Sequence, residues 1–112
     1  MAVSMDECIR NCTECHTICM KTVTHCLGVG GKHADQGHIR MLLDCAQICL
    51  THADFMARRS PHHAHLAGEC AEICAACAAL CEEHEDPDGE MQLCAKACRR
   101  CAESCSQMHG MH

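Results

Sequence analysis

Aromatic residues are almost absent from this sequence, and their absence limits how the interior of the protein can be filled. Phe55 is the single aromatic residue among 112, and there is neither Trp nor Tyr. A domain of this size normally fills its core with bulky aliphatic and aromatic side chains. Here 15 cysteines, together with Ala and Met, must fill much of the core. Cysteine packs as a small hydrophobic residue, but so many reactive sulfur atoms require a further reason.

Clusters of basic residues and long apolar runs are missing as well. Adjacent basic residues occur only as the pairs Arg58-Arg59 and Arg99-Arg100, and the formal net charge is −6. This balance argues against a surface that binds nucleic acids or anionic membranes. No stretch approaches the roughly 18 consecutive apolar residues that cross a bilayer. We therefore expect neither a nucleic acid nor a membrane as a partner.

The start of the sequence indicates the compartment. Residues 1–7 contain no basic region followed by an apolar region, so they do not resemble a secretory signal, and we expect a cytoplasmic location. Cytosolic thiols stay reduced, and cysteine clusters there indicate metal binding or catalysis rather than a disulfide framework. The odd count of 15 also rules out complete pairing within one chain.

One cysteine spacing, C-x3-C-x2-C-x3-C, organises the chain, because it occurs three times. A fourth copy is degenerate and carries His and Met at its last two positions. Both replacements are side chains that bind copper. The copies are Cys8, Cys12, Cys15 and Cys19; Cys70, Cys74, Cys77 and Cys81; Cys94, Cys98, Cys101 and Cys105; and, in the degenerate copy, Cys45, Cys49, His52 and Met56.

Steps of four, three and four residues match the period of an α-helix, so each copy predicts a helix with a cysteine face. Ile and Leu residues beside the cysteines, such as Ile73 and Leu93, are expected to seal the seams between helices. We expect one all-α domain over residues 1–112, an antiparallel, up-down-up-down four-helix bundle with a cysteine-lined core. The predicted helices span approximately 4–27, 35–59, 61–85 and 87–108.

Residues that commonly start or end helices support these boundaries. Ser4 and Asp35 are predicted to cap the first and second helices, and glycines after Leu27 to end the first. Ser60-Pro61 and Asp86-Pro87 each place a capping residue before a proline, which favours a helix that starts at once.

Four inward cysteine stripes bring their thiols into one core, and residues four apart on a helix lie about 5–6 Å apart at Cβ. Two such thiolates can hold one ion between them, and soft sulfur ligands select Cu(I). If every thiolate bridged two ions, the capacity would approach roughly one Cu(I) per cysteine. Zinc requires closed tetrahedral sets of four ligands, and a continuous sulfur ladder offers no obvious separate set. We expect the Cu(I) ligands to be all 15 cysteines, including Cys26.

The antiparallel order also sorts the remaining soft ligands between the two ends of the bundle. One end gathers Cys26, whereas Phe55 and several methionines suggest an apolar plug at the other. We favour the first end as the entrance for metal. His16, His33, His62 and His65 are assigned to the solvated surface. The expected accessory ligands are His38, His52, His84, Met41, Met56 and Met91.

These cysteine repeats resemble the cytosolic copper storage proteins, which are four-helix bundles that hold Cu(I) inside. The likeness extends from about Ser4 to Met108 and rests on the three complete repeats, the pair Cys45/Cys49 and Cys26. The resemblance implies storage of many Cu(I) ions per chain and a homotetramer of bundles. His52 and Met56 depart from a lining made only of cysteine.

Three other functions compete with a copper store that has no catalytic activity. A sink for zinc or another soft metal is compatible with thiolate ligands. A thiol redox enzyme would use C-x2-C pairs such as Cys12/Cys15, but the βαβ context of thioredoxin-like motifs is absent. A copper-responsive regulator would need a basic surface for DNA, which the acidic composition disfavours.

Overall fold

Long α-helices make up most of the computed structural model, which describes residues 2–84 and 86–110. A short 3-10 helix, η1 (Gly31–Ala34), joins the first α-helix to the second. No strand occurs within these described ranges, so the prediction of an all-α fold is confirmed. The four helices are α1 (Met5–Val29), α2 (Gln36–Ala57), α3 (His63–Glu82) and α4 (Glu90–His109).

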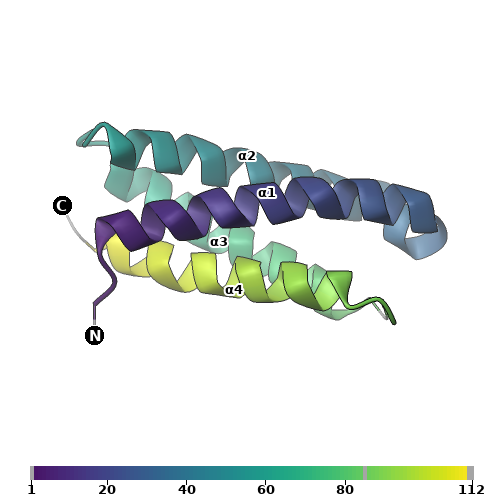
Figure 1. Cartoon of the computed structure of the whole chain (residues 1–112). Helices are drawn as coiled ribbons and strands as arrows, with labels where there is room; N and C mark the ends of the chain where they lie inside the picture. The colour runs from purple at the N-terminus through teal and green to yellow at the C-terminus, as the bar shows by residue number, and fades with distance from the viewer. Residues whose placement is uncertain (1, 85, 111–112) are drawn as a thin grey trace.

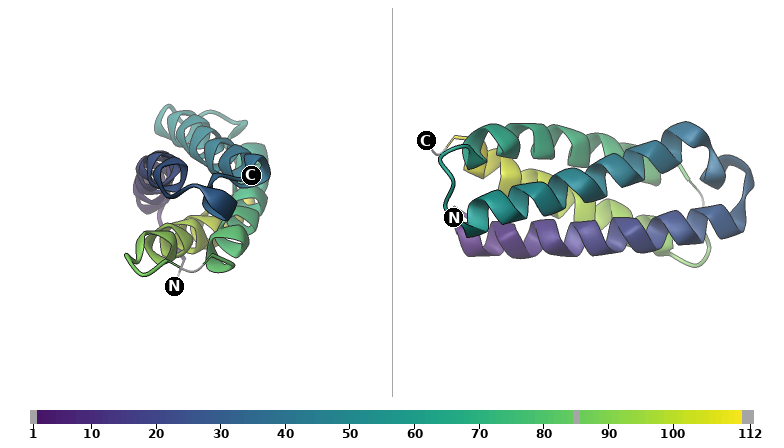
Figure 2. Two further views of the ribbon diagram at one scale, coloured as in Figure 1. Left: turned by 90° about the vertical axis from the view of Figure 1, so that its right-hand side faces the viewer. Right: turned by 90° about the horizontal axis from the view of Figure 1, so that it is seen from above.

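The four helices surround a common interior. Helices α1 and α3 each pack against both α2 and α4, so neighbours in the sequence are neighbours in space (Figure 1). The colour gradient runs one way along α1 and α3 and the other way along α2 and α4, consistent with an up-down-up-down order (Figure 2). We call the end where α1 begins and α4 ends the tail end, and the opposite end the η1 end.

Two predicted helix starts are confirmed in atomic detail. The Ser4 hydroxyl accepts a hydrogen bond from the Glu7 backbone N–H at 3.1 Å at the start of α1. The Asp35 carboxylate accepts from the Gly37 and His38 N–H groups at 3.0 and 3.4 Å at the start of α2. Such bonds satisfy N–H groups that have no partner within the first helical turn.

The two Pro-containing connections differ from the prediction, because neither proline opens its helix directly. Helix α3 starts at His63, after a turn in which the Ser60 hydroxyl accepts from the His62 N–H at 3.1 Å. Helix α4 starts only at Glu90. Gly89, with a φ of 79°, takes the N-cap position in place of Asp86, whose carboxylate nevertheless accepts from the Met91 N–H at 3.0 Å.

All four helix ends differ by one to three residues from the predicted boundaries, with α2 ending at Ala57 and α4 at His109. Helix α1 continues past Leu27 to Val29 and stops at Gly30, whose φ of 78° is open to glycine at little cost. Helix α3 ends at Glu82, and its predicted end at residue 85 lies outside the described residues.

Cysteine side chains form most of the core. All 15 are at most 1% exposed, and Leu42, Met56, Met91 and Met108 are the largest aliphatic side chains buried with them. The predicted seam residues Ile9, Ile18, Ile48 and Ile73 are half-buried and pack against this core. Leu93 was expected among them, but it is 57% exposed and that prediction is wrong. A position next to a buried cysteine therefore does not decide burial, since Ile73 precedes Cys74 as Leu93 precedes Cys94 and only Ile73 is half-buried.

Helix α3 is long and apolar enough to cross a bilayer by length and composition alone, contrary to the expectation that no segment would be. Its apolar character comes from cysteine and alanine. The four α3 cysteines all lie buried inside the bundle, packed against α2 and α4. The same composition therefore serves here to build a core helix.

Asp35 provides a test of the capping arrangement at the η1 end. Replacing Asp35 with Ala removes the acceptor for two backbone N–H groups and should lower the free energy of unfolding by about 1 kcal/mol. Asp35→Asn is the matched control, because Asn caps equally well and should change stability by only a few tenths of a kcal/mol. Urea unfolding of the metal-free protein measures both, and equal losses in the two variants would contradict the capping role.

Candidate metal centre

Helical periodicity places every cysteine of this chain in one interior. Each stripe repeats by four, three and four residues, so its thiols leave the same face of a helix and meet those of the neighbouring helices. Helix α1 interrupts its stripe at Thr22, which is buried and donates its hydroxyl to the Ile18 carbonyl oxygen. The prediction that the cysteines face one shared interior is confirmed, and all 15 are free thiols.

The sulfur atoms are close enough to share ions. Contacts between helices range from 3.4 Å for Cys49 and Cys74 to 3.9 Å for Cys8 and Cys105. Covalent disulfides are much shorter, at about 2.05 Å, so these are contacts between reduced thiols. Most join residues far apart in the sequence, such as Cys12 and Cys101 at 3.6 Å. The interior is therefore a dense array of thiols drawn from all four helices.

Eleven of the thiols and the ring of His52 form five groups of four possible ligands, and within each group the ligand atoms lie within 4.8 Å of one another. Taken in order along the bundle, each group shares two ligands with the next, so the groups join into one continuous ladder. From the tail end they are Cys8, Cys12, His52 and Cys105; Cys12, Cys70, Cys101 and Cys105; Cys49, Cys70, Cys74 and Cys101; Cys15, Cys45, Cys49 and Cys74; and Cys15, Cys19, Cys45 and Cys98.

This arrangement corrects one expectation from the sequence. We expected no separate tetrahedral sets, yet the first, third and fifth groups of the ladder have no ligand in common. Inter-helix contacts create these sets, and the spacing within one helix does not reveal them. A tetrahedral divalent ion has at most three non-overlapping positions among the five groups.

His52 is the only non-cysteine member of the ladder. Its ring is fully buried, and Nδ1 lies 3.6 Å from the Cys12 Sγ and 3.4 Å from the Cys105 Sγ. The sequence predicted this ring as an accessory ligand. Its placement among three thiols makes it available as a ligand, with the α2 stripe supplying nitrogen where the other stripes supply sulfur.

Beyond Thr22, a small mixed group lies at the η1 end. The Cys26 Sγ lies 3.5 Å from Nε2 of His38 and donates to the Met91 sulfur at 3.6 Å. His38 is nearly buried, and its Nδ1 has no hydrogen-bond partner among the described residues. Two of the predicted accessory residues, His38 and Met91, are thus brought directly to a cysteine.

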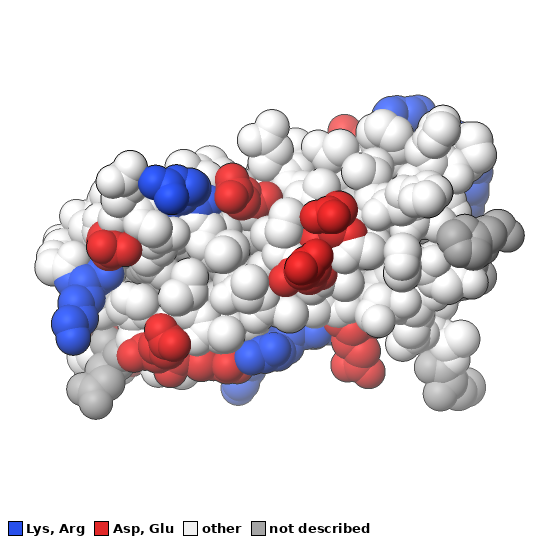
Figure 3. Space-filling model, turned by 180° about the vertical axis from the view of Figure 1, so that it is seen from behind, with Lys and Arg blue, Asp and Glu red and all other residues white. Residues whose placement is uncertain are grey.

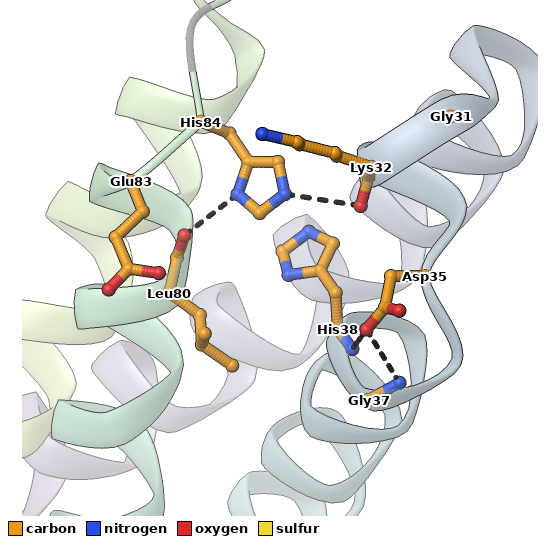
Figure 4. Close-up of a pocket in the computed structure, with 8 residues that line it drawn as sticks. All are labelled: Gly31, Lys32, Asp35, Gly37, His38, Leu80, Glu83 and His84. Atoms are coloured by element: carbon orange, nitrogen blue, oxygen red, sulfur yellow. Dashed lines mark hydrogen bonds between the residues drawn. The ribbon is translucent and has the colours of Figure 1, made fainter.

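His84 sits over this group without reaching its sulfur atoms. Its ring stacks on His38 with centroids 4.3 Å apart, and its two nitrogens face the Leu80 and Lys32 carbonyl oxygens at 2.8 and 3.3 Å (Figure 4). His38 and His84 line a surface pocket of about 550 Å³ with Asp35 and Glu83, among others. His84 therefore belongs to the wall of the pocket.

The remaining accessory candidates and surface histidines are placed less directly. Met56 is fully buried within the core, whereas Met41 is half-buried and packs against its edge. The assignment of His33 to the solvated surface is wrong, because its ring is half-buried 4.9 Å from the ring of His84 and its Nε2 is buried without a partner among the described residues. His33 lies in η1, outside the cysteine repeats, so no periodic pattern predicted where its ring would lie. His16 is also half-buried, with Nδ1 2.8 Å from the Ala46 carbonyl oxygen.

Burial and mutual hydrogen bonding set the protonation of the thiols. Desolvation, followed by repulsion from Cys94, raises the pKa of Cys26 to about 11. Hydrogen bonds with Cys105 and Cys12 lower the pKa of Cys8 to about 3. Within a hydrogen-bonded pair, the acceptor is stabilised as a thiolate while the donor keeps its proton. The pKa is raised for nine thiols: Cys12, Cys19, Cys26, Cys49, Cys74, Cys77, Cys81, Cys98 and Cys105.

The surface carries charges of both signs. Figure 3 shows acidic and basic side chains interspersed on one face, without a continuous basic patch among the described residues on that face. Several basic side chains are neutralised by ion pairs, including Arg99 with Glu82 at 2.7 Å and Arg100 with Glu14 at 2.8 Å.

Comparison with protein families supplies the observation that decides the relationship. A family model described as copper storage protein matches residues 1–110. The chain belongs to this family. A cysteine-rich protein of Bacillus subtilis strain 168, YhjQ, which is described as uncharacterized, is 37% identical over 103 residues that make up 92% of this chain and 94% of the relative.

Solved structures of family members show the same fold. The Cu(I)-bound copper storage protein BsCsp3 is 36% identical and superposes with a TM-score of 0.87, over 94% of this chain and 97% of the other. A cytosolic copper storage protein from Streptomyces lividans, solved with five coppers, is 29% identical. It superposes with a TM-score of 0.86 over 96% of this chain and 93% of the other. The resemblance inferred from the cysteine repeats is confirmed.

Burial predicts how the thiols of the metal-free protein react. A thiol reagent such as 5,5′-dithiobis(2-nitrobenzoate) should modify the folded, reduced protein slowly, because all 15 sulfur atoms are buried and must wait for local opening. In urea the reagent should report all 15 thiols rapidly. The absorbance of the thiolate that the reagent releases measures the rate. Rapid modification of many thiols in the folded protein would contradict their inward placement.

Proposed function

We propose that this protein stores Cu(I) in the cytoplasm by binding many ions to the thiolates inside its bundle. The observation that carries the proposal is the sulfur ladder, in which each group of four ligands shares two members with the next. A thiolate bridges two Cu(I) ions, and Cu(I) accepts two or three sulfur ligands. Shared ligands therefore suit a chain of neighbouring ions better than isolated ions.

Charge balance favours a monovalent cargo. Each Cu(I) that replaces one thiol proton leaves the charge of the core unchanged, so the interior can fill without accumulating charge. If a divalent ion replaced each thiol proton instead, the interior would gain one positive charge per ion, and charge in a dry interior is costly in free energy. The buried position of every cysteine makes this difference large.

The proposed ligands are the 15 cysteines, with His52 within the ladder and with His38 and Met91 beside Cys26. Met41, Met56 and His84 are proposed as accessory residues that line the path of the metal near the ends of the bundle. The η1 end is proposed as the entrance for metal, since His38 lines the surface pocket and its Nε2 lies 3.5 Å from the Cys26 Sγ. Phe55 is half-buried at the tail end, where Met56 and Met108 are buried.

Family membership and two relatives support copper storage and a cytoplasmic location. The solved relatives are described as a Cu(I)-bound storage protein and as a cytosolic storage protein with five coppers. We propose that this chain is a store without catalytic activity, located in the cytoplasm, and that it assembles as a homotetramer. A thiol redox enzyme is a weaker candidate, because its reactive cysteine would need to reach a substrate and all 15 are buried.

Copper titration separates storage from a zinc sink. Under anaerobic conditions, Cu(I) competed against a strong chromophoric chelator should reach roughly one ion per cysteine, because bridging thiolates serve two ions each. A tetrahedral divalent ion should reach about three equivalents, the number of groups in the ladder without a shared ligand.

A Cu(I) capacity of three or fewer per chain would refute storage in the ladder. Cys45→Ser serves as an internal check, because the Cys45 sulfur contacts Cys15, Cys74 and Cys98. Removing this sulfur should lower the capacity by about one or two ions. Ser106→Ala, an exposed change on α4, is the control and should leave the capacity intact.

Proton release provides a second test of the same chemistry. Nine thiols have a raised pKa and keep their protons at neutral pH, so Cu(I) must displace those protons when it binds. We expect about one proton for each Cu(I) that binds at one of these protonated thiols, and an apparent affinity that rises with pH because protons compete with the metal for sulfur. Titration in weak buffer with a pH indicator measures the release. Affinity that is independent of pH between 6 and 8 would contradict the account.

A further inference from the structure

The tail end of the sulfur ladder differs in chemistry from the rest, because one of its four ligands is a nitrogen. His52 on α2 lies beside Cys12 on α1 and Cys105 on α4, with Nδ1 at 3.6 and 3.4 Å from the two sulfur atoms. Cys8 contacts Cys105 at 3.9 Å and completes the group. All four side chains are fully buried.

The spacing of these atoms matches a tetrahedral zinc site. Zinc binds sulfur at about 2.3 Å and nitrogen at about 2.0–2.1 Å, so the edges of a tetrahedron are about 3.8 Å between sulfurs and about 3.6 Å between sulfur and nitrogen. The observed edges from Cys105 to Cys8 and to Cys12 are 3.9 and 3.6 Å. Those from His52 Nδ1 are 3.6 and 3.4 Å. Three cysteines with one histidine is also a ligand set of structural zinc sites.

Two properties distinguish this group from the four all-cysteine groups. A divalent ion bound by three thiolates and a neutral imidazole carries a net charge of −1, whereas four thiolates give −2, which costs more in a dry interior. A thiolate bridges two ions, but one imidazole nitrogen binds only one. The bridged Cu(I) chain therefore ends at His52, while a single tetrahedral ion uses all four ligands.

The surroundings of His52 point to a ligand as well. Nδ1 faces only thiols, and Nε2 is buried with no hydrogen-bond partner among the described residues. A fully buried imidazole with such weak partners is costly, and nearly all buried polar atoms in proteins are satisfied. A cation bound at Nδ1 would give this ring one strong interaction.

We propose that Cys8, Cys12, His52 and Cys105 form a site for one divalent cation of the zinc type. The site is occupied when copper is scarce, and it goes beyond copper storage because it uses one tetrahedral ion rather than a bridged chain. The ion joins the start of α1 to the last turns of α2 and α4. It therefore closes the tail end while the rest of the core is empty of metal.

Zinc titration of the reduced, metal-free chain tests the site. Zinc sulfate competed against a chromophoric zinc chelator should show one equivalent that binds more tightly than any later one. His52→Met replaces the imidazole with a thioether and should lower the affinity for the first zinc ion by at least about tenfold. Loss of a ligand should cost at least as much affinity as loss of a residue that hydrogen-bonds to a ligand. His16→Met is the matched control on a half-buried histidine outside the core, and it should leave the first equivalent unchanged. Equal zinc affinity in His52→Met and the parent chain would overturn the proposal.

A second measurement does not depend on how the variants fold. Zinc K-edge X-ray absorption of the parent chain with one equivalent of zinc should show three sulfur ligands and one nitrogen. Four sulfur ligands would place the ion in an all-cysteine group and overturn the proposal. The Cu(I) capacity is measured separately, so a failure of copper storage does not alter either zinc result.

Discussion

The whole structure depends on the packing of cysteine against cysteine across helix interfaces. A helix turn brings every third or fourth side chain to the same face, and here that face carries sulfur on all four helices. Cysteine is small, so the interior can hold 15 buried thiols with inter-helix sulfur contacts of 3.4 to 3.9 Å. The same contacts that stand in for an aliphatic core also define the metal ligands, so fold and function rest on one set of atoms.

Combining core and site in this way has a physical consequence. An aliphatic core gains its stability from apolar burial alone, whereas thiols in this core also hydrogen-bond one another and compete for protons. The ladder contains thiols of both kinds: hydrogen bonds with Cys101 and then Cys12 raise the pKa of Cys49, whereas hydrogen bonds with Cys105 and Cys12 lower the pKa of Cys8. Metal that replaces these protons converts weak thiol contacts into bonds. Storage and structural reinforcement are then the same event.

The sequence predicted much of this arrangement because its signals are periodic. The cysteine repeat indicated four helices and one sulfur-lined interior, and Ser4 and Asp35 indicated two helix starts. The errors occurred where local geometry decides the outcome. Gly89 and the Ser60 turn delay two helix starts, and Leu93 is exposed although its place before Cys94 matches that of the half-buried Ile73 before Cys74. Residues without a repeat gave no signal, which is why the place of His33 in η1 beside His84 was not predicted.

The division of the core into overlapping groups also lay beyond the sequence, since each group combines side chains from different helices. His52 shows this clearly, because its offset in the α2 repeat predicted an inward ring but its contacts with Cys12 and Cys105 depend on how α1, α2 and α4 pack. Copper K-edge X-ray absorption of the fully loaded protein tests the central claim most directly. Bridging thiolates predict two or three sulfur ligands per copper and a clear shell of neighbouring copper atoms. Isolated coppers with no metal neighbour, or with mainly nitrogen and oxygen ligands, would contradict the account.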